Sequence, residues 1–181
     1  MISDTPFPRR KSMRLPNYDY SQPGAYFVTL LTHQRQPFLC DIIHGRTCYS
    51  KFGTVVKDSL LDLPKYHSNL MLDEFCIMPD HLHAIIRLVE VCKGGSTDNS
   101  QHVMRPAETR PNNPTSLIEI IRAYKSFTSR KINAIHGTAG TSAWHRSYYE
   151  HVIRDEAELN QIRNYIVENP LKWELEKEGN R

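Results

Sequence analysis

Apolar positions recur with two different periods in the first half of this chain, and each period predicts one kind of element. Residues 25–32 (AYFVTLLT) are rich in β-branched and aromatic side chains and follow a Pro-Gly turn, which is typical of a strand. Residues 51–65 carry their Val and Leu residues at mixed helical spacing, which indicates a helix that stops at Pro64.

Two further strands are predicted next to each other. Residues 70–78 form one strand pattern, and residues 81–89 (HLHAIIRLV) form another after the break at Pro79-Asp80. Because only a tight turn separates the two patterns, we expect them to form an antiparallel hairpin.

The second half of the chain begins with a polar segment that contains Pro and Gly and shows no periodicity. We expect this segment, residues 92–115, to be a long loop. Ser116 and Glu119 then have the spacing of a capping box, which predicts a helix that runs to about Ile135. The inner face of this helix is expected to consist of Leu117, Ile120, Ile121, Tyr124 and Phe127.

One more strand and one more helix complete the chain. Residues 147–153 (SYYEHVI) predict the strand. Asp155 can cap the helix, Glu156 and Glu158 suit the positive end of its dipole, and Asn169-Pro170 is expected to end it. The order of strand, helix, strand, strand, helix, strand and helix predicts an α+β sandwich, in which helices cover one antiparallel sheet.

Composition narrows this interpretation to one intracellular domain. With 181 residues, 39% of them apolar, the chain suits a single domain at residues 18–173, between a basic arm (1–17) and a short tail (174–181). The four cysteines show no CxxC pair, and no segment is apolar enough for a signal peptide or a membrane span. We therefore expect a cytoplasmic protein with reduced thiols and no membrane partner.

The formal net charge is only +3, but basic residues cluster locally. A mild net charge with local basic clusters is compatible with a polyanionic partner and does not demonstrate one. A solvated tail is the alternative interpretation of the cluster near the N-terminus, which comprises Arg9, Arg10, Lys11 and Arg14.

The first candidate for chemistry is the His81-Leu82-His83 segment on a predicted strand. Because successive strand residues face opposite ways, His81 and His83 share one face and could hold one metal ion. With nine histidines in the chain, about half of one such pair is expected by chance. A hydrogen-bonded pair without a metal therefore remains an alternative.

The second candidate lies on the last predicted helix, where Tyr165 and Asn169 are four residues apart and share a face. A phenol and an amide oxygen are thus presented together. Taken singly, a tyrosine such as Tyr165 is more often a core aromatic, and an asparagine before proline, such as Asn169, more often just ends a helix.

Four segments in the same order give the sequence a resemblance to a known family. They are YDYSQPGAYFVTLLTHQRQPF, MPDHLH, AYKSFTSRKIN and WHRSYYEHVIRDEAELNQIRNYIVENPLKW. The chain resembles the IS200-like transposases, and within them the branch associated with repetitive extragenic palindromes, the REP-associated tyrosine transposases. The resemblance spans most of residues 18–173.

This resemblance implies an HUH endonuclease fold, a ferredoxin-like sandwich named for its His-hydrophobic-His strand. It assigns His81 and His83 as metal ligands, Asn169 as the third ligand, Tyr165 as the nucleophile, and Mg²⁺ or Mn²⁺ as the cofactor. Two positions depart from the family pattern: Asp80 stands where relatives often have Asn, and His145 where Gln is common. Asp80 could contact the metal or orient an imidazole, and we place it outside the ligand set.

The implied reaction is the cutting and rejoining of single-stranded, hairpin-forming DNA through a 5′-phosphotyrosine. The cation would polarise the scissile phosphate, and the covalent intermediate would let a second 3′-hydroxyl reverse the step. Such a protein would work in the cytoplasm at the nucleoid. Besides the N-terminal cluster, phosphate contacts are expected from the outer face of the 116–135 helix, although that face could also be merely solvated: Arg122, Lys125, Arg130 and Lys131.

Several alternatives stay open from the sequence. Of Tyr148 and Tyr149, one is expected in the core, and His151 is expected to be structural or to contact DNA. One alternative is a metal-dependent hydrolase in which His81 and His83 activate water and Tyr165 is only structural. Another is a protein that holds palindromic DNA without cutting it, although the presence of every proposed catalytic residue type counts against this alternative. The family includes monomers and homodimers, so the tyrosine could act in its own subunit or in a neighbouring one.

Overall fold

The structure is a computed structural model that describes residues 15–90 and 115–179. The N-terminal basic cluster (Arg9, Arg10, Lys11 and Arg14) and most of the segment predicted as a long loop lie outside the described residues.

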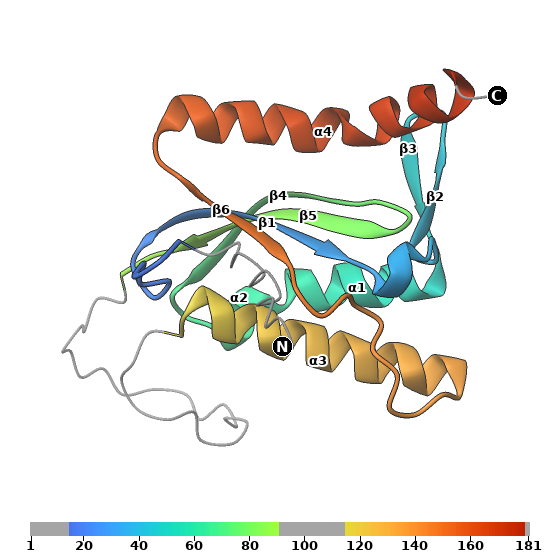
Figure 1. Cartoon of the computed structure of the whole chain (residues 1–181), viewed down its shortest axis with the longest axis horizontal. Helices are drawn as coiled ribbons and strands as arrows, with labels where there is room; N and C mark the ends of the chain where they lie inside the picture. Colours follow the sequence, from blue (N-terminus) through green and yellow to red (C-terminus); the bar gives the residue numbers. More distant parts are fainter. Residues whose placement is uncertain (1–14, 91–114, 180–181) are drawn as a thin grey trace, which may run out of the picture.

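A four-stranded antiparallel sheet forms the centre of the described fold (Figure 1). Across the sheet the strands run in the order β4 (Leu70–Ile77), β5 (His81–Leu88), β1 (Gly24–Leu31) and β6 (Tyr149–Ile153). A helix follows β1 and another follows β5, so this strand order is the βαββαβ arrangement of a ferredoxin-like fold. The predicted α+β sandwich is confirmed.

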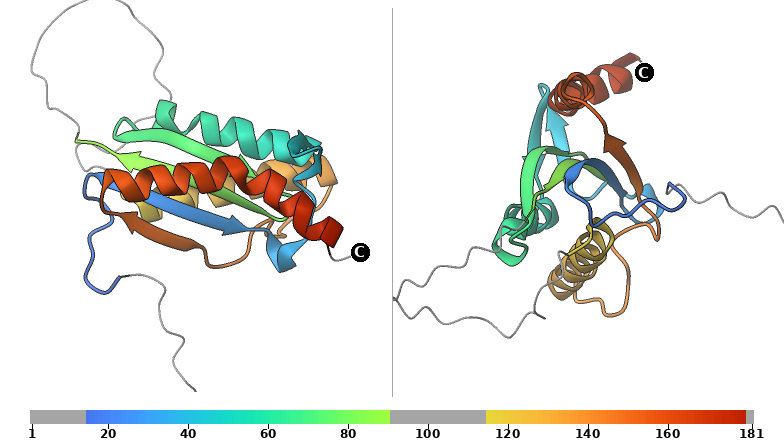
Figure 2. Two further views of the ribbon diagram at one scale, coloured as in Figure 1. Left: turned by 90° about the horizontal axis from the view of Figure 1, so that it is seen from above. Right: turned by 90° about the vertical axis from the view of Figure 1, so that its left-hand side faces the viewer.

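Helices cover both faces of the sheet (Figures 1 and 2). On one face lie α1 (Lys51–Leu61), the short α2 (Leu63–Tyr66) and α3 (Leu117–His136), and on the other lies α4 (Glu156–Gly179). The capping box of α3 forms as predicted, because Ser116 accepts from the backbone of Glu119 while the Glu119 carboxylate accepts from the backbone of Ser116.

Side chains alternate along β5 between two apolar clusters. Leu82, Ala84 and Ile86 pack with the large cluster beneath α1 and α3, whereas Ile85 packs with a smaller one that includes Leu159 of α4. Both faces of β5 are therefore covered, and the polar residues of this strand that face α4 lie in a sheltered layer.

The structure corrects the prediction of one continuous helix over residues 51–65. The first helix ends at Leu61, and Pro64 lies in the first turn of the separate helix α2 instead of at a helix end. This is physically reasonable, because the first helical positions need no backbone N–H donor, which proline lacks.

The predicted inner face of the 116–135 helix is wrong at one position. Phe127 is 40% exposed and lies under the Lys131 ammonium, 4.5 Å from its ring centre. Thr128 is buried instead, and its hydroxyl accepts a hydrogen bond of 2.8 Å from the Trp144 indole. At this point of the helix Thr128, and not Phe127, therefore faces the core.

The sequence did not predict a second small sheet beside the first. It is the hairpin β2 (Cys40–Ile43) and β3 (Arg46–Tyr49), which follows the short 3₁₀ helix His33–Arg35. In Figure 1 this hairpin stands at the C-terminal end of α4. Gly53 at the start of α1 packs against the chain before it, because an added Cβ would lie 1.9 Å from the Leu39 carbonyl oxygen.

The last helix is longer than predicted. It continues through Pro170 to Gly179 and so includes residues that were expected to form a tail. Among the residues that the structure describes, no helix combines the length and the apolar character that crossing a bilayer would require.

Candidate active site

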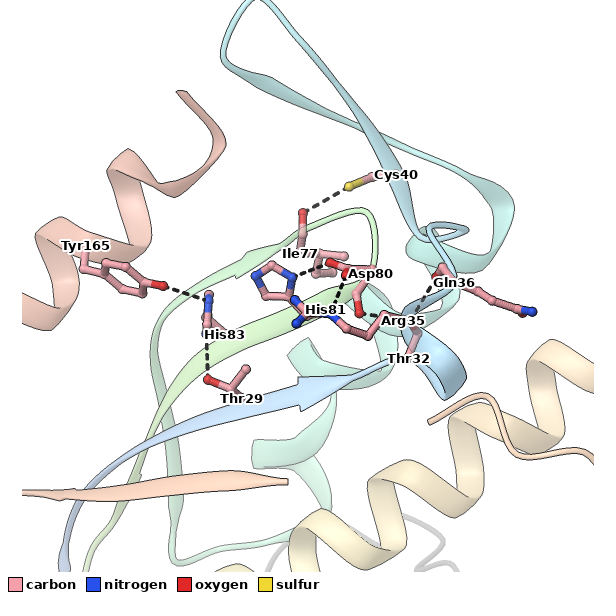
Figure 3. A network of polar contacts seen from close by, with 10 residues as sticks. All are labelled: Thr29, Thr32, Arg35, Gln36, Cys40, Ile77, Asp80, His81, His83 and Tyr165. Carbon is pink, nitrogen blue, oxygen red and sulfur yellow. Dashed lines mark hydrogen bonds and ion pairs between the residues drawn. The ribbon is translucent and has the colours of Figure 1, made fainter. Parts of the chain in front are cut away.

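The two histidines of β5 lie on the side of the sheet that faces α4 (Figure 3). They line a cavity of about 300 Å³. Both imidazoles are buried, with 7% exposure for His81 and 6% for His83. The cavity lies between the sheet and α4, and its walls consist of Thr29, Leu31, Arg35, His81, His83, Tyr165, Asn169, Lys172, Trp173 and Glu176.

The ring of His81 is oriented by the carboxylate of its neighbour. The Nδ1 atom of His81 lies 2.6 Å from Oδ1 of Asp80, and Oδ2 of Asp80 accepts from Nε of Arg35 at 3.0 Å. A carboxylate only accepts, so Nδ1 carries the proton and the Nε2 lone pair is left for another partner. Asp80 therefore orients an imidazole, which is one of the two roles considered for it from the sequence.

His83 is held by the neighbouring strand and by α4. Its Nδ1 atom lies 2.8 Å from the Thr29 hydroxyl, which stands directly opposite in the β1–β5 register, and its ring stacks on Phe27 with centroids 5.2 Å apart. On the other side, Nε2 lies 3.3 Å from the phenol oxygen of Tyr165.

Burial keeps both imidazoles in the form that can bind a metal. Desolvation lowers the pKa of His83 to about 3, and the nearby His81 adds to this effect. Desolvation also lowers the pKa of His81, although Asp80 opposes the shift. Burial would raise the pKa of Asp80, but the hydrogen bonds from His81 and Arg35 bring that pKa below its usual value. Near neutral pH the group thus contains two neutral imidazoles beside a carboxylate.

Tyr165 is not a core aromatic. Its side chain is 42% exposed, its ring meets the edges of Phe27 and His83, and its hydroxyl points at His83 across the cavity wall (Figure 3). The two hydrogen-bonded residues are 82 positions apart in the sequence and belong to the same chain.

Asn169 lies one helical turn beyond Tyr165 and is 9% exposed. It lines the same cavity, and its side-chain amide makes no hydrogen bond to the residues that the structure describes. Its polar atoms are accessible from the cavity, so this arrangement suits an amide that meets a ligand there. It does not suit an amide that only ends a helix, since α4 continues past it.

The donor set suits a divalent cation that it shares with a substrate. Within residues 15–90 and 115–179, no group of three or more His, Cys, Asp and Glu side chains is close enough to hold a metal. His81, His83 and Asn169 line one cavity and could instead supply two imidazole nitrogens and an amide oxygen to part of a ligand shell. Water and phosphate oxygens would complete that shell.

Sequence reasoning missed several residues of the cavity wall. Trp173 lies one turn beyond Asn169, and its ring centre is 5.8 Å from that of His81. Helical spacing would have placed Trp173 and Lys172 at the cavity if the helix had been continued through Pro170. Thr29 could have been found from the strand register, whereas Arg35 lies in an irregular turn, has φ of 54°, and carries no local signal.

The structure does not bring the predicted DNA contacts of α3 to this cavity. Arg122, Arg130 and Lys131 are exposed, but α3 covers the opposite face of the sheet. Lys125 is half-buried, and its ammonium donates to the carbonyl oxygens of His145 and Arg146 at 2.8 and 3.0 Å.

Tyr148, Tyr149 and His151 lie in or next to β6, the strand that precedes α4 in the chain. Tyr148 is half-buried against the main core, while Tyr149 is 41% exposed and meets the edge of Phe27. His151 lies 2.7 Å from the carboxylate of Glu158, which also caps the backbone of Arg154. Of the adjacent tyrosines, one therefore joins the core, as expected.

A His-hydrophobic-His strand in a ferredoxin-like sheet, facing a helix that carries one tyrosine, defines the class of single-tyrosine HUH proteins. No protein-family model matches the chain. An uncharacterized protein of Haemophilus influenzae is 33% identical over 172 residues, which are 93% of this chain and 92% of that protein. A candidate REP-associated tyrosine transposase of the same organism is 24% identical over 161 residues, covering 87% of this chain and 77% of that protein.

Among solved structures, a REP-associated tyrosine transposase bound to a REP hairpin shares the fold. Its TM-score is 0.56 at 16% identity, and the match covers 88% of this chain and 73% of that one. The chain therefore resembles the REP-associated tyrosine transposases, in fold through the solved structure and in sequence through the second Haemophilus protein.

Proposed function

We propose that this protein cuts and rejoins single-stranded, hairpin-forming DNA, with Tyr165 as the nucleophile. The observation that carries the proposal is the 3.3 Å separation between the phenol oxygen of Tyr165 and Nε2 of His83, at the wall of a cavity that also includes His81 and Asn169. A tyrosine with only a structural role would not need to be half exposed beside two neutral, buried imidazoles.

In the proposed reaction the Tyr165 oxygen attacks the scissile phosphorus, and the bond from phosphorus to the 3′ oxygen breaks. The 3′ oxygen leaves with the bonding electron pair and takes up a proton from solvent, so the products are a 5′-phosphotyrosine and a free 3′-hydroxyl. His81, His83 and Asn169 would hold Mg²⁺ or Mn²⁺, which would stabilise the negative charge that develops on the phosphate.

The phenol of Tyr165 loses its proton during the attack, and Nε2 of His83 cannot take up that proton if it binds the metal. This nitrogen has a single lone pair, so it cannot accept a proton from Tyr165 and serve as a metal ligand at the same time. Because the tyrosine side chain is 42% exposed, we propose that its proton passes to solvent once Nε2 is engaged.

The phosphotyrosine keeps the energy of the broken phosphodiester. A second DNA 3′-hydroxyl can therefore attack it, release Tyr165 and restore a continuous strand without an external energy source. Both steps use the same side chains, so a protein that cuts through this site can also join.

Hairpin DNA is the proposed partner, since a solved relative of the same fold is bound to a REP hairpin. Arg35 and Lys172 border the cavity and would contact the phosphates of the strand that enters it. A stem could be gripped by the N-terminal basic cluster, with Arg122, Arg130 and Lys131 added only if the DNA reaches the opposite face of the sheet. Lys125 is omitted from this set because its ammonium already holds two carbonyl oxygens.

The test is a labelled hairpin oligonucleotide with a single-stranded flank, incubated with Mn²⁺ or Mg²⁺ and run on a denaturing gel. Wild-type protein should give a covalent adduct. Tyr165→Phe should bind the hairpin normally and give no adduct. Tyr149→Phe is the matched control, a similarly exposed tyrosine of β6, and should behave as wild type. An adduct with Tyr165→Phe, or cleavage by the wild type without any adduct, would overturn the proposal in favour of another nucleophile or of activated water.

A further inference from the structure

The C-terminal third of α4 begins at Pro170, where one backbone hydrogen bond of the otherwise continuous helix is missing. Pro170 has no backbone N–H, so the hydrogen bond that would normally reach the Ile166 carbonyl is missing. Beyond this point lie Lys172, Trp173 and Glu176, which form part of the cavity wall. An external contact is therefore needed to fix this part of the helix relative to the imidazoles.

That contact comes from the tip of the β2–β3 hairpin. The two-residue turn between these strands consists of His44 and Gly45, both with positive φ (52° and 68°), as a type I′ turn requires. Their successive backbone N–H groups donate to the two carboxylate oxygens of Glu174, at 2.8 and 2.5 Å. Consecutive N–H groups in a turn form a natural site for an anion, and here the anion is supplied by α4.

The fit between the turn and the helix is also close in shape. A Cβ atom added to Gly45 would lie 3.2 Å from Cδ1 of Leu171, so no larger residue fits without a shift. Ile42 of the same hairpin packs against the apolar cluster beneath α4. The hairpin thus contacts the helix immediately after Pro170 through both polar and apolar groups.

We propose that Glu174 is a positioning residue, and that its contact with the β2–β3 turn determines where Asn169 and Trp173 lie relative to His81 and His83. The inference rests on the proposed function. On the other side of Tyr165 the helix is held by a separate bond, in which Arg163 donates to both oxygens of Asp73 at 2.9 and 2.6 Å. The segment that carries Tyr165 and Asn169 is therefore held on both sides, and loss of Glu174 would release its C-terminal end, which begins next to Asn169 and includes Trp173.

Glu174→Gln tests this with a side chain of the same shape. An amide nitrogen cannot accept a hydrogen bond, so one of the two turn N–H groups would lose its partner. We expect faster hydrogen exchange in residues 171–177 and adduct formation slower by about tenfold or more, with hairpin affinity unchanged. Glu74→Gln is the control, because Glu74 is an exposed residue of β4 that does not line the cavity, and its carboxylate pairs with no group among the described residues.

A second variant separates the contact from the identity of the turn residue. His44→Asn keeps both N–H groups and places at positive φ a residue that adopts it readily, so exchange and adduct rate should match those of the wild type. If residues 171–177 of Glu174→Gln exchange hydrogen at the wild-type rate, the contact does not hold this part of the helix. If they exchange faster while the adduct forms at the wild-type rate, Glu174 is not a positioning residue. If the wild type itself gives no adduct while exchange in Glu174→Gln is faster, the proposed function fails and the contact stands.

Discussion

Asp80 fixes the orientation of His81, because one carboxylate oxygen faces the imidazole Nδ1 and the other faces Arg35. This arrangement leaves Nε2 as the only ring nitrogen of His81 that can reach a cation in the cavity. The sequence located both histidines on one strand face, and simple alternation was sufficient for that. It could not locate Arg35, which reaches Asp80 from a turn 45 positions away.

At the scale of the residue, we predict that Asp80→Ala weakens Mn²⁺ binding by about 10 to 100-fold, as loss of a group that orients a metal ligand commonly does. Isothermal titration calorimetry with Mn²⁺ measures the effect directly. Asp58→Asn, an exposed change on α1 across the sheet, should leave the affinity unaltered. Equal affinity of Asp80→Ala and wild type would show that His81 needs no orienting partner.

At the scale of the element, α4 shows where local signals are overridden. Asn169-Pro170 predicted a helix end, yet contacts on both sides of Pro170 keep the helix continuous to Gly179. The strands β2 and β3 were missed because each has only four residues, and a run of four is too short for an alternating pattern to indicate a strand. By contrast, the strands of the main sheet and α3 followed their periodicity and caps, because their apolar faces are buried.

The bond between Arg163 of α4 and Asp73 of β4 gives a prediction with a definite pH dependence. The hydrogen bonds from Arg163 lower the pKa of Asp73 in the folded protein, and burial opposes this. The stabilisation is therefore complete above the unfolded pKa, near 3.8, and is lost as the pH falls through the lower folded pKa. Asp73→Asn should reduce the free energy of unfolding by about 1 to 2 kcal/mol at pH 7, a discounted value for a partly exposed bidentate pair.

Urea denaturation of Asp73→Asn and wild type at a series of pH values measures this difference. The difference in free energy of unfolding should narrow as the pH is lowered below about 4. Asp73 of the wild type is then protonated and, like the asparagine of the variant, no longer forms an ionic bond with Arg163. A difference that stays constant down to the lowest pH would mean that the carboxylate charge contributes nothing to the docking of α4.

At the scale of the whole molecule, the ferredoxin-like sheet brings together side chains that are distant in the sequence. The order of elements predicted the sandwich, and helical spacing predicted that Tyr165 and Asn169 share a face. Only the family resemblance suggested that this face meets the histidines, since no local pattern relates residues 82 positions apart. In the structure, the phenol of Tyr165 and the imidazoles of His81 and His83 of the same chain line one cavity.

This arrangement predicts catalysis within a single chain. If each molecule uses its own tyrosine, a mixture of His83→Ala and Tyr165→Phe should form no adduct on the labelled hairpin, since neither protein has both groups. Recovery of the adduct in the mixture would indicate that the tyrosine helix acts on the histidines of a partner.

The most direct test of the account is to identify the residue that becomes attached to DNA. Adduct formed by the wild-type protein on a hairpin oligonucleotide can be digested with a protease and nuclease and sequenced by mass spectrometry. We predict a single phosphonucleotide-bearing residue, Tyr165, joined to the 5′ side of the cut. Attachment at Tyr149 or at any other residue would contradict the central claim that the tyrosine facing His83 is the nucleophile.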